Sequence, residues 1–300
     1  MSLDIFGFRA MWSPYFFISL LVISAIFFLA ATKYRIKFKD SEPITTKQTV
    51  LFIVSVVLLY AVKGSPLDLL GHIMFSAHMT QMAVLYLAIP PLLILAIPKW
   101  MWRSFLNIKV IGRVFSFCTI PLISLIVFNG LFSFYHIPLI FDFIKTDMLL
   151  HAIYTSILFI TVIFMWWPLV NQLPEQETLS GVKKVGYIFG NGILLTPACA
   201  LIIFADAPMY STFSDPNAWA QAMELCVPSS ALSSLNLSGP EMFNGLPLLE
   251  DQQLGGILMK VIQEIVYGTV LGYIFFAWFR KENAEADKMD EALVKFQTVE

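Results

Sequence analysis

The chain has 300 residues, of which 58% are hydrophobic and 13% are charged. Ordinary soluble domains carry about a quarter charged residues, so this composition predicts an integral membrane protein in contact with the lipid bilayer. The formal net charge of −2 lacks the basic excess of nucleic-acid-binding proteins and argues against a nucleic-acid partner. The three cysteines, Cys118, Cys199 and Cys226, are too scattered for a disulfide framework or a zinc site.

Seven stretches are apolar and long enough to cross a bilayer, which takes about 20 helical residues. We therefore expect an all-α polytopic membrane protein whose seven transmembrane helices form one domain over residues 1–280. Residues 206–253 would be a long loop before the last span, and residues 281–300 a charged tail. The expected spans are about 13–32, 48–64, 72–97, 114–134, 147–168, 185–205 and 254–279.

The lysine and arginine residues gather in alternate connections. The first, third and fifth connections and the C-terminal tail hold fifteen of the nineteen. Because cytoplasmic loops are enriched in Lys and Arg, we expect the N-terminus outside the cell membrane and the C-terminus in the cytoplasm. The loop 206–253 is then extracytoplasmic.

Proline, tryptophan and glycine residues mark local features of the spans. Pro90-Pro91 predicts an interruption and a kink in the third span. Glycine pairs at a spacing of four, Gly186/Gly190 and Gly268/Gly272, allow close helix contact. We favour packing within the chain for these glycines, with a homodimer contact as the alternative. Tryptophans near the span ends are expected at the membrane interface: Trp100, Trp102, Trp166, Trp167 and Trp278.

The segment 72–82 is the part of the chain that is richest in metal-binding side chains. It holds two of the four histidines and three of the thirteen methionines. If the segment is one helix, Met74, His78 and Met82 share one face, and His72 and Met79 share a second. Imidazole and thioether groups together suit copper, and Cu(I) in particular.

The other two histidines, His136 and His151, also fall at outer span ends on this topology. We expect His78 and Met82 to supply two copper ligands and another residue of the outer ends a third. The alternative is that the methionines fill the core and the histidines form ordinary hydrogen bonds. The candidate ligands are His78, Met82, Met79, Met74, His151, His136 and Asp251, with His72 less favoured.

The start of the seventh span carries several ionisable residues. Asp251 shares a helix face with Gly255 and Met259 and could bring a carboxylate to the outer site. A helix-capping role for Asp251 is the alternative. Lys260 and Glu264 are an i, i+4 pair inside the span, where ionisable residues default to pairing or to function.

No Walker loop, GxGxxG or GxSxG motif occurs in the chain, and we expect no enzyme. Two alternatives to a copper-holding protein stay open. A copper transporter would need ligands at successive depths, and the cytoplasmic halves of the spans offer Cys118, Met101 and Met165. A haem-binding protein could use His78 and His151 at matched depth.

Several motifs together resemble the CtaG family, the integral-membrane assembly factors for caa(3)-type cytochrome c oxidase in Bacillus-like bacteria. The resemblance covers nearly all seven spans. The motifs are His78-Met79-Thr80-Gln81-Met82 followed by Pro90-Pro91-Leu92-Leu93, His136-Ile137-Pro138, His151 followed by Trp166-Trp167-Pro168, Pro208-Met209-Tyr210, and Asp251-Gln252-Gln253-Leu254-Gly255-Gly256.

The resemblance implies an accessory protein of the bacterial cell membrane. It would receive copper from an extracytoplasmic copper chaperone and help insert it into the Cu(B) centre of oxidase subunit I. His78 would be the leading copper contact, with His136, His151 and Asp251 as further family positions. The chain departs from the family at Met82 and at Thr155, where relatives often carry histidine. Retained thioethers with fewer imidazoles would suit Cu(I).

Overall fold

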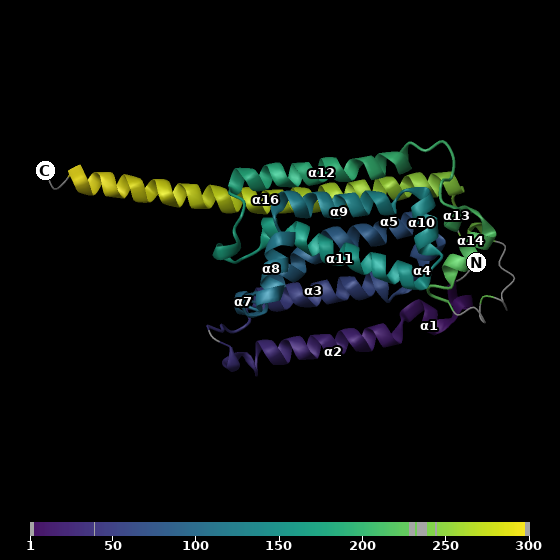
Figure 1. Ribbon diagram of the computed structural model, residues 1–300, viewed down its shortest axis with the longest axis horizontal. Helices are drawn as coiled ribbons and strands as arrows, with labels where there is room; N and C mark the ends of the chain where they lie inside the picture. Colours follow the sequence, from purple (N-terminus) through teal and green to yellow (C-terminus); the bar gives the residue numbers. More distant parts are fainter. Residues whose placement is uncertain (1–2, 39, 228–231, 233–238, 244, 298–300) are drawn as a thin grey trace.

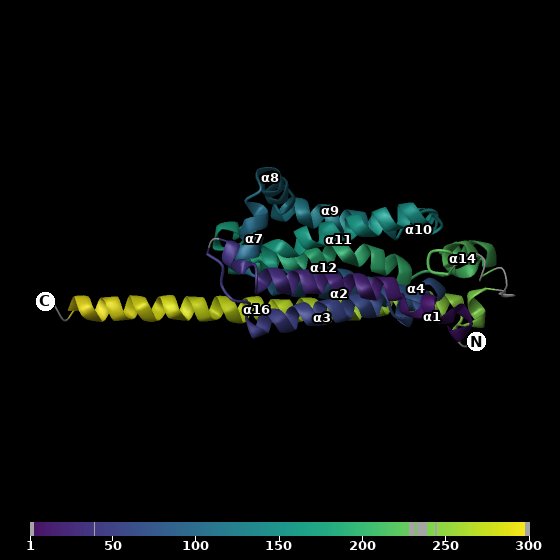
Figure 2. The same cartoon turned by 90° about the horizontal axis from the view of Figure 1, so that it is seen from below.

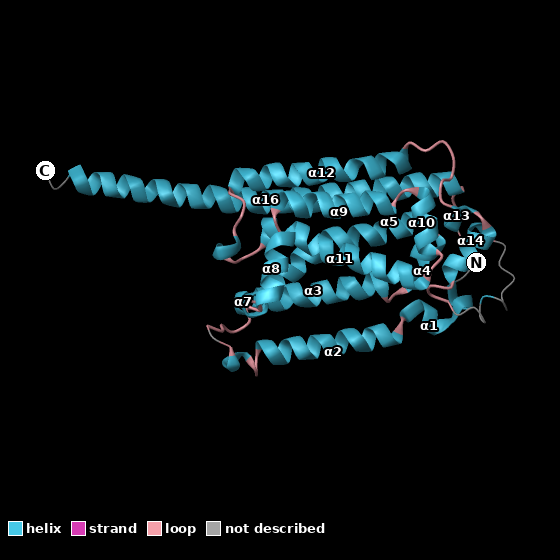
Figure 3. Ribbon diagram, viewed as in Figure 1, coloured by secondary structure: helices cyan, strands magenta, loops and turns pink. Residues whose placement is uncertain are grey.

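The computed structural model describes residues 3–38, 40–227, 232, 239–243 and 245–297, and these residues form helices and no strands. The long helices lie side by side in one bundle (Figures 1 and 3). In chain order the helices are α1 (Gly7–Trp12), α2 (Pro14–Ala31), α3 (Thr46–Lys63), α4 (Pro66–Ile73), α5 (Phe75–Ala83), α6 (Ile89–Ala96), α7 (Lys99–Leu106), α8 (Lys109–Cys118), α9 (Pro121–Tyr135), α10 (Pro138–Lys145), α11 (Met148–Val170), α12 (Gly181–Ile203), α13 (Ser211–Ser214), α14 (Pro216–Met223) and α16 (Leu248–Gln297).

Six helical segments of the described chain are long and apolar enough to cross a membrane, and one bent pair of helices could make a seventh span. The prediction of an all-α, multi-pass membrane protein is confirmed. The six are Leu3–Ala31, Thr46–Lys63, Phe75–Ala96, Met148–Val170, Gly181–Ile203 and Leu248–Arg280.

The bent pair, α8 and α9, replaces the straight span expected over 114–134. The two helices meet at an angle of 75°. Pro121 is the first residue of α9 and carries no N–H group, and Ile120 before it leaves the helical conformation, with φ −55° and ψ 124°. As a result α8 turns away from the line of α9, as Figure 2 shows.

The third span stays helical from Phe75 to Ala96, so the predicted interruption at Pro90 takes the form of a change in helix type. A π-helical turn, Val84–Ala88, joins α5 to α6. Because Pro90 has no N–H group, the carbonyl of Tyr86, four residues earlier, lacks an α-helical donor. The indole Nε1 of Trp166 donates to this carbonyl at 3.2 Å. Trp166 and Trp167 are buried in the core, and Trp100 is buried too, at 4% exposed. The expectation of interfacial anchors is therefore wrong for these three residues.

The two ends of the bundle differ in chemistry. One end carries α4, α10, α13 and α14 near the N-terminus, and we call it the histidine end (Figure 1). The opposite end carries α7, α8 and the start of α12, and we call it the basic end. The N-terminus outside and the C-terminus in the cytoplasm remain a prediction.

The long loop and the tail are both partly helical. Within 206–253 the chain forms α13 and α14, whereas residues 228–231, 233–238 and 244 lie outside the described residues. The carboxylate of Asp142 in α10 holds the loop, since it accepts hydrogen bonds from the backbone N–H groups of Ser211 and Thr212 at 2.8 and 3.0 Å. Helix α16 continues through the predicted tail to Gln297.

We predict that Trp166→Phe lowers the free energy of unfolding by about 1–3 kcal/mol, because it leaves the buried carbonyl of Tyr86 without a donor. Trp278→Phe is the control, since the Trp278 indole donates to Glu282 in an exposed setting. Unfolding in mixed detergent micelles measures both variants. Equal stability of Trp166→Phe and the unsubstituted protein would contradict this role of the Trp166 indole.

Candidate functional site

The segment 72–82 is broken into two helices at Met74. Helix α4 ends at Ile73, and Met74 adopts an extended conformation with φ −121° and ψ 134° before α5 begins at Phe75. The prediction that 72–82 is one helix, with Met74, His78 and Met82 on one face, is therefore wrong. Met74 packs with the buried cluster that contains Leu69 and Trp219, away from the other donors of the segment.

The carboxylate of Asp251 caps the start of α5. Its Oδ2 accepts a hydrogen bond from the Phe75 N–H at 2.7 Å, and its Oδ1 accepts one from the Ser76 hydroxyl. A carboxylate is stabilising here because the N-terminus of a helix carries free N–H groups and partial positive charge. The capping alternative thus describes the structure better than the ligand hypothesis, although the helix capped is α5 rather than α16.

Helix α16 reaches α5 because Gly255 has no side chain. A Cβ atom on Gly255 would lie 2.8 Å from Cδ1 of Phe75 and 3.1 Å from Cγ of Met79. Met79 is fully buried on this side of α5. Its thioether therefore belongs to the contact between α5 and α16.

Three of the four histidines line one cavity of about 510 Å³ at the histidine end. His72 comes from α4, His78 from α5 and His151 from α11, and Met82 lines the same cavity one turn after His78. The ring centroids of His72 and His151 are 6.1 Å apart. We call this space the histidine cavity. The break at Met74 separates α4, which carries His72, from α5, which carries His78, and both residues line this space.

Two imidazole nitrogens in the histidine cavity are buried without a partner. His72 and His78 are 5% and 4% exposed. Neither Nδ1 of His72 nor Nε2 of His78 has a hydrogen-bond partner among the described residues. Buried polar atoms without a partner are uncommon and costly. Each of these two nitrogens therefore lacks a hydrogen-bond partner in the core, on a residue that lines the cavity. No three His, Cys, Asp or Glu side chains in the described chain form a ready-made metal cluster.

His136 lies apart from the histidine cavity. Its Nδ1 is 2.8 Å from the carbonyl oxygen of Phe132, and its own carbonyl accepts a hydrogen bond from the Tyr210 hydroxyl at 2.8 Å. The Phe141 ring contacts both His78 and His136, with centroid distances of 5.2 and 6.3 Å. Burial lowers the pKa of His136 to about 4. His136 is therefore a neutral core residue at pH 7.

Sequence analysis missed the polar residues around the histidine cavity. The Gln81 amide donates to the carbonyl of Val62 and, at 2.5 Å, to the carboxylate of Asp68. Asp68 also pairs with Lys63 at 2.8 Å. Lys63 and Gln81 both line the cavity. The sequence feature that could have identified Gln81 is its spacing of three residues from His78, which places both side chains on one side of α5.

The second missed residue is Lys145 at the end of α10. It is fully buried, and its Nζ donates to the carbonyl of Gly71 at 3.1 Å and lies 3.8 Å from the centroid of the Phe213 ring. Burial lowers the pKa of Lys145 well below its usual value. Burial also lowers the pKa of His72, and the charge of Lys145 lowers it further. Neutral imidazole, the form that binds metal ions, is thus favoured at His72.

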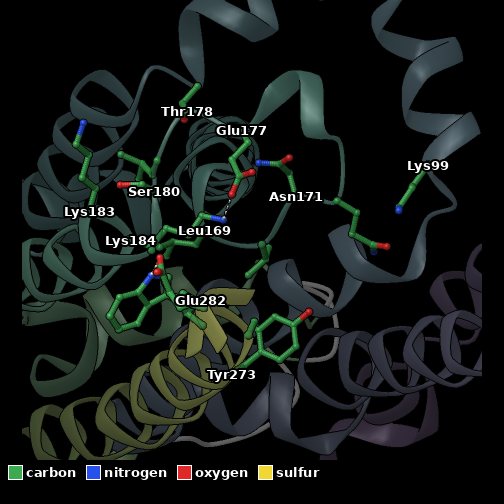
Figure 4. A pocket seen from close by; sticks show the side chains of 17 residues that line it. Lys99, Leu169, Asn171, Glu177, Thr178, Ser180, Lys183, Lys184, Tyr273 and Glu282 are labelled. Atoms are coloured by element: carbon green, nitrogen blue, oxygen red, sulfur yellow. Dashed lines mark hydrogen bonds and ion pairs between the residues drawn. The ribbon is translucent and has the colours of Figure 1, made fainter. Parts of the chain in front are cut away.

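The pocket at the basic end has a different chemistry (Figure 4). It has a volume of about 780 Å³ and is lined by Lys99, Lys183 and Lys184. Lys184 pairs with Glu177 at 3.1 Å. Its lining includes no histidine, cysteine or methionine, so it offers none of the side chains that favour copper.

Comparison with known families identifies the chain. A family model described as cytochrome c oxidase caa3 assembly factor (Caa3_CtaG) matches residues 11–281. The chain belongs to this family. The match includes α4, α5 and α11, and therefore the whole histidine cavity. Membership of the caa3 assembly factor family implies association with the oxidase in a bacterial membrane. No curated protein and no solved structure matches the chain.

We predict that Asp251→Asn lowers the free energy of unfolding by about 1–3 kcal/mol, because it removes a charge-assisted helix cap. The neighbouring exposed carboxylate provides the control, and Glu250→Gln should change stability by less than about 0.5 kcal/mol. If Asp251→Asn left stability unchanged but abolished copper binding, the carboxylate would be a ligand and not a cap.

We predict that His136 makes the protein less stable as the pH falls. Its pKa is about 4 in the folded protein and about 6.5 in an unfolded chain. The folded state therefore binds fewer protons, and stability is lost as the pH drops below 6.5. From pH 7 to pH 5 this loss is about 2 kcal/mol. His136→Gln should remove that part of the pH dependence, and identical profiles for the two proteins would contradict the prediction.

Proposed function

We propose that the protein holds copper in the histidine cavity and supplies it to the Cu(B) centre of oxidase subunit I. The observation that carries the proposal is the pair of buried, unpartnered nitrogens on His72 and His78. The two histidines that carry them line one cavity together with His151 and Met82. A bound metal ion would satisfy both nitrogens. Copper would be cargo in this account and not a resident catalytic cofactor.

The chemistry of the donors favours Cu(I) over harder ions. Thioether sulfur is a soft ligand that favours Cu(I), and imidazole suits copper as well. Met82 supplies the thioether of the cavity lining, and His72, His78 and His151 supply the imidazoles.

The depth of the histidine cavity suits delivery to a membrane-embedded client. Its lining runs along α11 from His151 to Ile160, about 14 Å at 1.5 Å per residue. Ile160 is 51% exposed, so the cavity reaches the lipid-facing surface beside α11. Phe16 of α2 and Leu59 of α3 line it across from α11. Copper from an extracytoplasmic chaperone would enter at the histidine end, and the oxidase subunit would approach from the side.

The transporter alternative receives no comparable support. It needs soft ligands toward the basic end, where Met165 is a candidate. The Met165 sulfur instead accepts a hydrogen bond from the Asn191 amide at 2.8 Å. Uptake of copper into sealed vesicles would favour the transporter, and a Soret absorption band in the purified protein would favour the haem alternative.

We predict that His78→Gln combined with Met82→Leu weakens Cu(I) binding at least tenfold, on the order of what metal sites lose when supporting residues are changed. His136→Gln is the matched control, since His136 lies outside the histidine cavity and should leave binding unchanged. Competition with a Cu(I) chelator under anaerobic conditions measures the affinities. Unchanged binding in the double variant would show that the cavity is not the copper site.

A further inference from the structure

An ion pair lies on the surface of α16, inside the segment that is long and apolar enough to cross a membrane. Lys260 and Glu264 form an ion pair of 3.0 Å, and the Glu264 side chain is 66% exposed. Glu264 lies about 20 Å along α16 from the helix-capping Asp251, at 1.5 Å per residue. Charged side chains at this depth rarely face lipid and mark functional sites by default.

Next to this ion pair is a buried amide without a partner. Gln263 is fully buried, and neither its Nε2 nor its Oε1 has a hydrogen-bond partner among the described residues. Together with Lys260, Glu264, Gly192 and Gly268 it lines a pocket of about 260 Å³. An amide needs both a donor and an acceptor. The pocket therefore presents unmet hydrogen-bonding capacity beside the lipid-facing surface.

Two glycines lie on the same face of α16 as Lys260 and Glu264, and we call this row of residues the ridge. Lys260, Glu264, Gly268 and Gly272 follow one another at intervals of four residues and share one slowly turning face. A Cβ atom on Gly268 or Gly272 would meet no atom within 4 Å, whereas one on Gly256 would lie 2.7 Å from Ile203. The expected packing within the chain is therefore wrong for Gly268 and Gly272. A ridge of i, i+4 residues with glycines is the geometry of a close, right-handed crossing of two membrane helices.

We propose that this ridge binds the same ridge of a second copy of the chain, so that two α16 helices cross in parallel at Gly268 and Gly272. Such a two-fold interface requires a surface that complements itself. The ridge supplies a lysine and a glutamate, which are opposite charges on the same surface. Lys260 of one copy can then pair with Glu264 of the partner subunit.

The position of the ridge leaves the histidine cavity free. The pocket beside the ridge is lined by α12 and α16, whereas the histidine cavity is lined by α2 to α5 and α11. Figure 1 shows α12 along one edge of the bundle and α2 along the opposite edge. A dimer formed through α16 would therefore keep both histidine cavities open to the oxidase and to the copper chaperone.

The glycines provide the first test. Gly268→Ile combined with Gly272→Ile adds side chains that meet no atoms within one copy but separate two crossing helices. We expect the dissociation constant of the dimer in lipid vesicles, measured by single-molecule photobleaching, to rise at least tenfold. Gly130→Ile is the matched control, since a Cβ atom on Gly130 of α9 also meets no atom within 4 Å, and it should dimerise normally. Monomers of the unsubstituted protein at all protein-to-lipid ratios would overturn the proposal, as would normal dimerisation of the double variant.

Exchanging the charges of Lys260 and Glu264 provides a second test, which distinguishes a contact between two copies from a contact within one copy. Lys260→Glu and Glu264→Lys each break the ion pair within a copy and place like charges across the two-fold axis. We expect weak dimers of either variant alone and restored dimers when the two variants are reconstituted together and followed by energy transfer. Equal association in all three samples would overturn the proposal. The proposal would also be overturned if the unsubstituted protein were monomeric and the glycine double variant lost its association with the oxidase. The ridge would then bind a helix of the oxidase.

Discussion

The carboxylate of Asp251 fixes the geometry on which the candidate site depends. It binds the first N–H group of α5 and the neighbouring Ser76 hydroxyl, and this contact ties the last span to the third. The chain can therefore leave α4 at Met74 in an extended conformation and restart as α5 with its first turn capped. Gly255 permits the close approach that the cap requires. The relative positions of His72 and His78 follow from this contact.

The opposite side of the break is held by Lys145. Its Nζ donates to the carbonyl of Gly71 and lies against the Phe213 ring, so α10 and the loop that contains α13 fix the end of α4. Burial is the main cause that lowers the pKa of the neighbouring His72. Lys145 thus helps to fix the end of α4 at the histidine cavity.

The large features of this fold could be predicted because they depend on local sequence. Long apolar stretches predict spans wherever they occur, and Pro90 removes an α-helical hydrogen bond whatever surrounds it. The gathering of His72, His78 and His151 at one end also followed from counting spans. The break at Met74 could not be predicted in this way, because no Gly or Pro marks it within 72–82. Its stabilising partner, Asp251, is 176 residues away from Phe75.

Contacts between residues that are distant in the sequence also explain which candidate ligands lie outside the histidine cavity. Met74, Met79, His136 and Asp251 have suitable donor atoms, but their directions are set by packing between distant helices. The lipid-facing position of Gly268 and Gly272 likewise depends on where the other helices lie, and not on the spacing of the glycines. Sequence placed three histidines at one end of the molecule, whereas tertiary contacts decide which candidate residues line the cavity there. The copper chemistry remains a prediction.

The most direct test of the central claim is the copper content of the Cu(B) centre in caa3 oxidase purified from cells that carry His78→Gln with Met82→Leu, measured relative to haem. The account predicts that Cu(B) falls to the level found in cells that lack this protein, while the His136→Gln control retains full Cu(B). Full occupancy of Cu(B) in the double variant would contradict the account.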